Sequence, residues 1–229
     1  MRVVSLVPSL TEAIAVSAPG VLVGATDWCT HPAGLEVARV GGTKNPSVPA
    51  VLALRPDLVV ANEEENRAVD LDELRAAGVQ VDVTHVRTLD QGFAELRRVL
   101  GLVGVAPSWL DAAEAAWAAS YDGDRRTAVI PIWRRPWMAV GSDTFAGDVL
   151  SRLGIDNVLA DSPDRYPRFA VDEVAVDVIV LPDEPYAFTA ADGPEAFAAP
   201  CVLVSGRHLT WYGPSLVVAR SVLLEQLWP

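Results

Sequence analysis

The stretch VGGTKNPSVPAVLALRPDLVVANEEEN, residues 40–66, carries the pattern that decides the fold. Its apolar run at residues 58–61 has the length of a buried strand, and an acidic segment follows it directly. Similar short apolar runs recur along the chain and alternate with helical patterns. This alternation predicts an α/β protein with parallel sheets built from strand–helix–strand units.

Seven strands are predicted on this basis, at residues 3–7, 21–25, 58–61, 79–83, 126–133, 176–181 and 202–205. Ser9 is the expected N-cap of the first helix, with Glu12 as its capping-box partner. Residues 88–121 have helical periodicity, interrupted at residues 101–107. We therefore predict two small parallel-sheet lobes with flanking helices, bridged by a single helical connector. The expected boundaries are an N-terminal lobe at residues 1–87, the connector at 88–122 and a C-terminal lobe at 123–229.

Composition excludes several classes of function. The 229 residues include 18 basic and 30 acidic side chains, and the resulting net charge of −12 repels nucleic acid and anionic membranes. A content of 51% hydrophobic residues is ordinary for a globular protein, so disorder is not expected. No apolar run approaches the roughly 20 residues that a membrane-spanning helix needs.

Residues 2–14, 40–66 and 141–158 together resemble the class III substrate-binding proteins of vitamin B12 and siderophore importers, the helical-backbone metal receptor type. The similarity covers nearly the whole chain, and the LRPDLVVA element with the GGT and PSVPA segments upstream is its most specific part. The resemblance implies two lobes joined by a backbone helix, with a small-molecule ligand bound in the cleft between them. It identifies a fold better than a ligand.

Two departures from that family suggest a relative outside the transport system. No signal sequence is recognisable at the start of the chain, so a cytoplasmic location is predicted, with Cys29 and Cys201 as free thiols. The connector is also short, because Asp122-Gly123-Asp124 interrupts it. A transporter partner is therefore doubtful. The Pictet-Spengler cyclases, which condense an indole amine with an aldehyde, are relatives of this kind and provide an alternative function.

In the N-terminal lobe, candidate ligand-binding residues follow the predicted strands. Trp28 is the strongest expected contact, and His31 beside it is either a ligand group or a hydrogen-bonded loop histidine. Three adjacent glutamates follow Asn62; they are candidate proton carriers if the protein is an enzyme, or else the solvated start of a helix. The complete set expected at this rim is Trp28, His31, Asn62, Glu63, Glu64, Glu65, His85 and Arg87.

In the C-terminal lobe, the segment IWRRPWMAVGSDTF, residues 132–145, combines aromatic faces with guanidinium groups that suit a flat or anionic ligand. Trp133, Arg134, Arg135 and Trp137 are its candidates, although core packing of the tryptophans and a salt bridge from an arginine to the opposite lobe are the alternatives. We expect Arg134, Arg135 and Trp137 to face the three glutamates. Later loops add the binding candidates Asp143, Phe145, Tyr186, His208, Trp211 and Tyr212, and the candidate acids Asp183 and Glu184.

The sequence therefore leaves two main hypotheses for the function. The first is a non-catalytic binding protein for a flat or aromatic small molecule. The second is an enzyme that uses Glu63 to Glu65, Asp183 or Glu184 for acid–base catalysis. No cofactor is expected, and no metal site, because no second histidine or cysteine lies at ligand spacing from His31.

Overall fold

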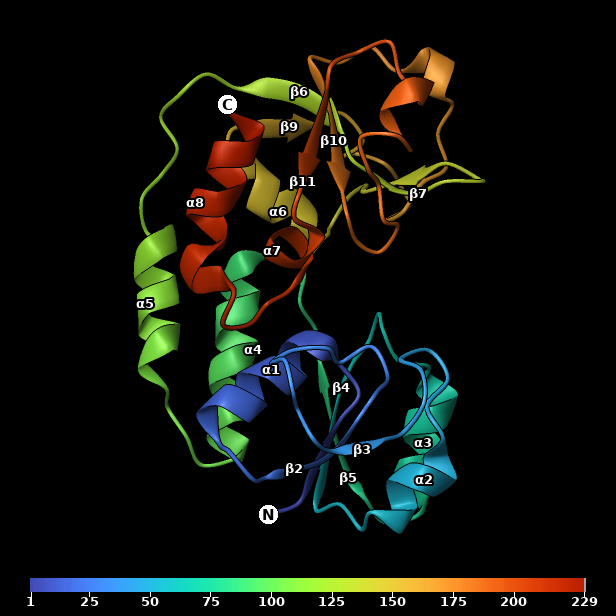
Figure 1. Cartoon of the computed structure of the whole chain (residues 1–229), viewed down its shortest axis with the longest axis vertical. Coiled ribbons are helices and arrows are strands. Elements are labelled where there is room, and N and C mark those ends of the chain that lie inside the picture. The colour runs from blue at the N-terminus through green and yellow to red at the C-terminus, as the bar shows by residue number, and fades with distance from the viewer. Residues whose placement is uncertain (229) are drawn as a thin grey trace. The chain divides into compact units, whose positions relative to one another are not determined.

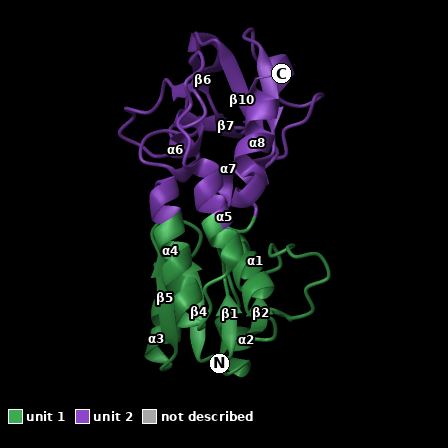
Figure 2. Ribbon diagram, turned by 90° about the vertical axis from the view of Figure 1, so that its left-hand side faces the viewer, with its two compact units in different colours: residues 1–85, 93–111, 212–214 green, residues 86–92, 112–211, 215–229 purple. Residues whose placement is uncertain are grey.

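The computed structural model describes residues 1–228 and divides into two compact units (Figure 2). Unit 1 comprises residues 1–85, 93–111 and 212–214, and unit 2 comprises residues 86–92, 112–211 and the residues from 215 onward. A segment near the C-terminus therefore completes unit 1. The predicted boundaries after residues 87 and 122 stay predictions.

Unit 1 is built on a five-stranded parallel sheet in the order β3-β2-β1-β4-β5. The interior strand β4, which lies between β1 and β5, is buried at every position, as expected for a parallel strand covered on both faces. Helices α1 and α4 lie on one side of the sheet, and α2 and α3 lie on the other (Figure 1). The elements are β1 (Val3–Ser5), α1 (Pro8–Ser17), β2 (Leu22–Ala25), β3 (Ala38–Arg39), α2 (Val48–Ala53), β4 (Leu58–Asn62), α3 (Ala68–Ala76) and β5 (Gln80–Thr84).

The core of unit 1 explains the apolar pattern of the sequence. One cluster of fully buried side chains joins the sheet to α2 and α3, with Val59 and Ala61 from β4, Val51 from α2 and Leu74 from α3. The alternation of β4 side chains places residues 59 and 61 on one face of the sheet. The acidic segment that follows β4 is thereby fixed at the carboxyl edge of the sheet.

Unit 2 contains a four-stranded parallel sheet in the order β11-β10-β6-β9 and a separate antiparallel hairpin of β7 and β8. Helix α8 and the hairpin lie on opposite sides of the sheet (Figure 1). The elements are β6 (Arg126–Val129), β7 (Pro131–Trp133), β8 (Met138–Ala139), α6 (Phe145–Ser151), β9 (Ile155–Asn157), η1 (Val171–Glu173), β10 (Val178–Pro182), η2 (Pro194–Ala196), β11 (Cys201–Val204), α7 (Gly206–Thr210) and α8 (Leu216–Leu227).

The segment predicted as one connector forms two helices, α4 (Leu89–Leu102) and α5 (Ser108–Trp117). They are separated where the sequence interrupts the helical pattern, because Gly104 adopts a φ of 79° and Pro107 cannot continue a helix. The division between the units falls within each helix. The fold class, two parallel-sheet α/β lobes with flanking helices, is confirmed.

Three local expectations are wrong. Helix α1 begins at Pro8 with Val7 at the N-cap and no side-chain cap, so Ser9 is not the capping residue. Proline at the first helical position needs no hydrogen-bond donor, which explains this start. The predicted strand at residues 126–133 is divided between β6 and β7, and the short strands β3, β8 and β9 were missed.

Candidate functional site

Two asparagines fix the loop that carries the three glutamates. The side-chain oxygen of Asn62 accepts a hydrogen bond from the amide of Glu64 at 2.8 Å, and that of Asn66 accepts one from the amide of Asn62 at 2.9 Å. Asn66 in turn donates to the carbonyls of Leu6 at 3.3 Å and Thr43 at 2.9 Å. The loop is therefore a closed turn tied to two other segments of unit 1. Because α3 begins only at Ala68, the glutamates do not form a helix N-terminus.

Tyr212 completes this network from the C-terminal part of the chain. Its hydroxyl lies 3.0 Å from Nδ2 of Asn62 and 2.9 Å from Oγ1 of Thr84, and only 5% of the residue is exposed. Burial, followed by the charge of Glu65, raises the pKa of Tyr212 well above its usual value. The phenol therefore stays protonated and acts as a fixed hydrogen-bonding group of unit 1.

The three glutamates have different surroundings. Glu63 lies 2.8 Å from Nδ1 of His85, so these two rim candidates form one pair. The backbone carbonyl of Glu64 accepts a hydrogen bond from Lys44. Burial raises the pKa of Glu65 to about 7, and the positive charge of Lys44 opposes that shift only in part. The carboxylate of Glu65 therefore titrates near neutrality.

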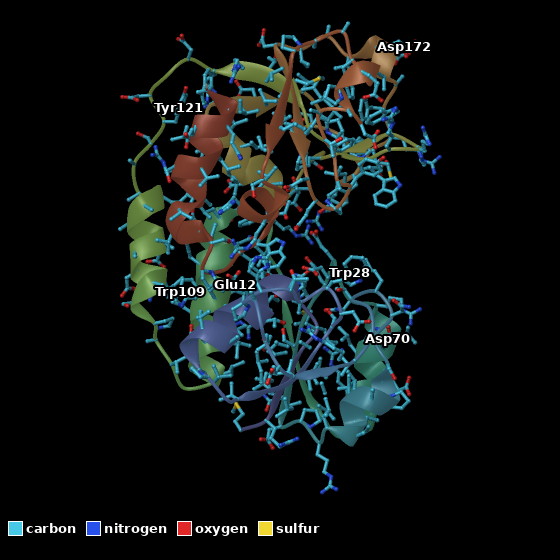
Figure 3. The ribbon with its side chains drawn as sticks, viewed as in Figure 1. Glu12, Trp28, Asp70, Trp109, Tyr121 and Asp172 are labelled. Atoms are coloured by element: carbon cyan, nitrogen blue, oxygen red, sulfur yellow. The ribbon has the colours of Figure 1, made fainter. Side chains whose placement is uncertain are left out.

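Trp28 is presented on a loop with a buried anchor. Trp28 is 68% exposed, whereas the neighbouring Cys29 is fully buried. Figure 3 shows the Trp28 side chain. The guanidinium of Arg39 donates to the carbonyls of Thr26 and Cys29, at 2.9 Å each, and so holds the loop. Next in the loop, Nδ1 of His31 lies 3.1 Å from Oγ1 of Thr30.

Cys29 is a structural thiol. Its sulfur lies 3.0 Å from the hydroxyl of Thr11 and 3.2 Å from that of Thr26. Burial raises its pKa, which keeps the thiol protonated and poorly nucleophilic. Cys29 and Cys201 are both free.

In unit 2, the two candidate acids after β10 bond to the two ends of α7, Asp183 to its first residue and Glu184 to the residue that follows the helix. Asp183 accepts a hydrogen bond from the amide of Gly206 at 2.6 Å, and Glu184 accepts one from Nε1 of Trp211 at 2.9 Å. His208 belongs to the same region, with Nδ1 at 2.8 Å from Oγ of Ser205. These contacts hold both carboxylates in place within unit 2. Their proposed catalytic roles stay predictions.

The two tryptophans of the β7–β8 hairpin have different environments. Trp133 is 45% exposed and packs edge-on against Tyr186, with 5.7 Å between the ring centroids. Trp137 stacks on Phe188 at 5.9 Å and contacts Phe197 at 5.1 Å. The ring of Trp137 is therefore part of an aromatic core, whereas that of Trp133 is presented at the surface of unit 2.

The arginines of the hairpin also differ. Arg134 forms ion pairs with Asp192 and Glu195, both in unit 2, so its charge is partnered within its own unit. Asp192 also accepts a hydrogen bond from the hydroxyl of Tyr186 at 2.6 Å, a contact that raises the tyrosine pKa. Arg135 is exposed, with a φ of 69°. The expectation that these arginines face the glutamates joins residues of different units and stays a prediction.

A third group of candidates lies around a cavity of about 340 Å³ in unit 2. Arg87 and Asp143, which form an ion pair, both line it. Phe145 starts α6 and is only 8% exposed. Arg87 was expected on the N-terminal rim, but it belongs to unit 2.

Each unit therefore brings several predicted residues together at the carboxyl ends of its strands. Unit 1 gathers Trp28, Asn62, Glu63, Glu64, Glu65, His85 and Tyr212, and unit 2 gathers Trp133, Asp183, Glu184, Tyr186, His208 and Trp211. Sequence reasoning missed Lys44, Thr84, Asp192 and Glu195 as partners. Lys44 lies inside the quoted GGTKN segment, but nothing in the spacing indicates the other three.

Residues 1–228 contain neither a cluster of metal-ligating side chains nor a helix suited to span a bilayer. No group of three or more histidine, cysteine, aspartate or glutamate side chains in this range has a geometry that could hold a metal ion. Within the same residues, no helix combines the length and the apolar character needed to span a bilayer.

No family model matches the chain, but individual relatives do. A vitamin B12-binding protein of Pectobacterium carotovorum subsp. carotovorum (strain PC1) is 24% identical over 249 residues, which cover 99% of this chain and 88% of that protein. The crystal structure of the periplasmic vitamin B12-binding protein BtuF of Vibrio cholerae superimposes with a TM-score of 0.74 at 21% identity, covering 99% of this chain and 96% of that one. A periplasmic heme-binding protein from Pseudomonas aeruginosa gives a TM-score of 0.81 at 24% identity, covering 100% and 92%.

These relatives correct one expectation. The solved proteins are periplasmic, which contradicts the predicted cytoplasmic location and points to the periplasm. That prediction relied on the first residues of the sequence, and the start of a sequence does not by itself report a compartment. The names of the relatives are those of binding proteins, and they give no support to the cyclase alternative. Sequence and fold together identify the chain as a relative of the class III substrate-binding proteins.

Proposed function

We propose that the chain is a binding protein for a small molecule with a broad flat face, of the corrinoid or haem type, and that Trp28 is a principal contact. The observation that carries this proposal is the indole of Trp28, 68% exposed on a loop held by Arg39 and the buried Cys29. A large exposed aromatic ring on a fixed loop offers contact area at little cost in conformational entropy.

Trp133 in unit 2 supports the same assignment. Its ring is 45% exposed, and its edge-on contact with Tyr186 holds it in one orientation. The neighbouring Trp137 is packed among phenylalanines, so the exposure of Trp133 is not a general property of the hairpin. We include Trp133 and Tyr186 among the proposed ligand contacts.

Binding is favoured over catalysis by the surroundings of three of the candidate acids, Glu63, Asp183 and Glu184. Asp183 and Glu184 each accept a hydrogen bond from the α7 segment, and Glu63 is paired with His85. A proton carrier must be able to reach its substrate in the correct protonation state. These contacts instead suit carboxylates that position loops. A receptor of this type delivers its ligand to a membrane importer, which is the partner that we propose.

Tryptophan fluorescence with defined probes tests the proposal. We expect cyanocobalamin or hemin to quench the emission of the wild-type protein with saturation. Replacement Trp28→Ala should weaken that affinity about tenfold, the effect of losing about 1.4 kcal/mol of contact energy. Trp109→Phe is the matched control, because the indole of Trp109 donates to Ser17 Oγ within unit 1 and has no proposed ligand role. Failure of both probes to bind the wild type would overturn the proposal.

A further inference from the structure

The carboxylate of Glu65, the last of the three adjacent glutamates, accepts no hydrogen bond from residues 1–228. No hydrogen bond or ion pair joins it to a described residue, although the side chain is mostly enclosed by protein. Glu63 is paired with His85, and the amide of Glu64 is bound to Asn62. The Lys44 ammonium, whose charge lowers the pKa of Glu65, donates to the backbone carbonyl of Glu64.

The position of Glu65 is recessed and still reachable. Its exposure is intermediate, so solvent reaches the side chain, while the surrounding protein removes most of its hydration. Burial makes the ionised form of such a carboxylate unfavourable, and the pKa of Glu65 is therefore raised to about 7. Unfavourable carboxylates of this kind concentrate at functional sites.

The loop leaves Glu65 little freedom to escape this position. Asn62 and Asn66 fix the backbone on both sides of the glutamates through side-chain to amide hydrogen bonds of 2.8 and 2.9 Å. The carbonyl of Thr43, on the loop next to Lys44, accepts a further bond of 2.9 Å from Asn66. Glu65 is thus preorganised, as a group that binds a ligand should be.

The ionisable groups near Glu65 come from four segments of unit 1. Lys44 stabilises its ionised form, whereas the charge of Glu65 raises the pKa values of Cys29 and Tyr212. Glu63 and Glu64 adjoin it in the loop. Because the charge of Glu65 acts on the thiol of Cys29, Glu65 lies near the loop that presents Trp28. Lys44 is the only cation in this set, and it neutralises the carboxylate incompletely.

We propose that Glu65 accepts a hydrogen bond from a nitrogen donor of the ligand, an amide or an ammonium group, and so selects ligands that carry such donors over ligands that carry carboxylates there. The inference rests on the proposed function, and it adds the chemistry of one ligand group. A recessed carboxylate binds an N–H donor strongly, and it repels an anion. Corrinoids carry peripheral amides, whereas haem carries carboxylates.

The test measures dissociation constants for cyanocobalamin and hemin between pH 6 and pH 8. Ionised Glu65 is the better acceptor, so cyanocobalamin should bind the wild type more tightly as the pH rises through 7, by about threefold to tenfold. Glu65→Gln keeps an acceptor oxygen and should remove this pH dependence. Glu65→Leu removes the acceptor and should weaken binding about tenfold or more. Glu73→Gln, which removes an exposed charge from α3, is the control and should behave as the wild type.

The outcomes separate this inference from the proposed function. Tight binding of cyanocobalamin that is equal in wild type and Glu65→Leu would overturn the role of Glu65 and leave the binding function intact. A second result would also overturn the role of Glu65. In it, the wild type binds hemin more tightly than cyanocobalamin, and the affinity for hemin falls as the pH rises in the wild type but not in Glu65→Gln. That result would show that an anionic group of the ligand lies beside Glu65. Absence of binding for both probes would overturn the proposed function, and the inference with it.

Discussion

The hydroxyl of Tyr212 lies 3.0 Å from Nδ2 of Asn62, although 150 positions separate the two residues. Asn62 ends β4 and holds the amide of Glu64, so the C-terminal part of the chain fixes the glutamate loop of unit 1. Glycine at position 213 allows this approach, because a Cβ there would lie 3.1 Å from the carbonyl oxygen of Ser9.

Tyr212→Phe should lower the free energy of unfolding by about 1–3 kcal/mol, because the amide of Asn62 and the hydroxyl of Thr84 would lose a buried partner. Urea denaturation measures the change. Tyr121→Phe is the control, since the Tyr121 ring stacks on Trp228 and that contact survives removal of the hydroxyl. Equal losses in the two variants would show that the phenol contacts of Tyr212 contribute nothing.

Glu65 should give the protein a distinctive dependence of stability on pH. Its pKa is about 7 in the folded protein and near 4.5 when unfolded, so between these values the folded state binds more protons. The free energy of unfolding should therefore fall as the pH rises from about 4.5 to 7, by about 3 kcal/mol from this group, and level off above 7. Denaturation of Glu65→Gln across this range should lack that component; an identical slope in both proteins would refute the assignment.

The two hairpin tryptophans should respond oppositely to truncation. Trp137→Ala opens a cavity among Phe188 and Phe197, and we expect a loss of about 3 kcal/mol in stability. Trp133→Ala should cost less than about 1 kcal/mol, because nearly half of the residue is exposed, and should instead weaken ligand binding. Thermal denaturation and probe titration of both variants test the distinction, which fails if Trp133→Ala is the less stable protein.

Gly141 precedes the turn that leads into α6, and no larger side chain fits there. A Cβ at this position would lie 2.4 Å from the carbonyl oxygen of Asp164 and 2.6 Å from Pro167. Gly141→Ala should therefore destabilise the protein by about 1–3 kcal/mol. Gly101→Ala, in the last turn of α4 with open space around it, should instead stabilise by up to about 1 kcal/mol. If calorimetry shows that the two substitutions change the stability of the protein in the same direction, these expectations are wrong.

The fold could be predicted because its signals are local. Apolar runs such as residues 58–61 report buried strands directly, and the interruption at residues 101–107 reports a break between helices. The strands β3 and β9 have only two and three residues, too few for a pattern to appear. The start of α1 was misplaced because Ser9 and Glu12 match a capping box that the chain does not form.

The candidate site was harder to predict because its partners are distant in sequence. Trp133 and Trp137 look alike in the sequence, and only the position of Phe188, 51 residues after Trp137, separates the packed ring from the exposed one. Likewise, nothing near Arg134 indicates that Asp192 and Glu195 neutralise it. The acidic loop was identified from its place after β4, but the special environment of Glu65 depends on the folding of unit 1 around it.

The most direct test of the binding function is isothermal titration calorimetry of the wild-type protein with cyanocobalamin, hemin and tryptamine. We expect saturable binding of cyanocobalamin or hemin at one site per chain. The substitution Trp28→Ala should weaken this binding, and tryptamine should not bind. Heat from tryptamine binding alone, with neither macrocycle bound, would contradict the proposed binding function.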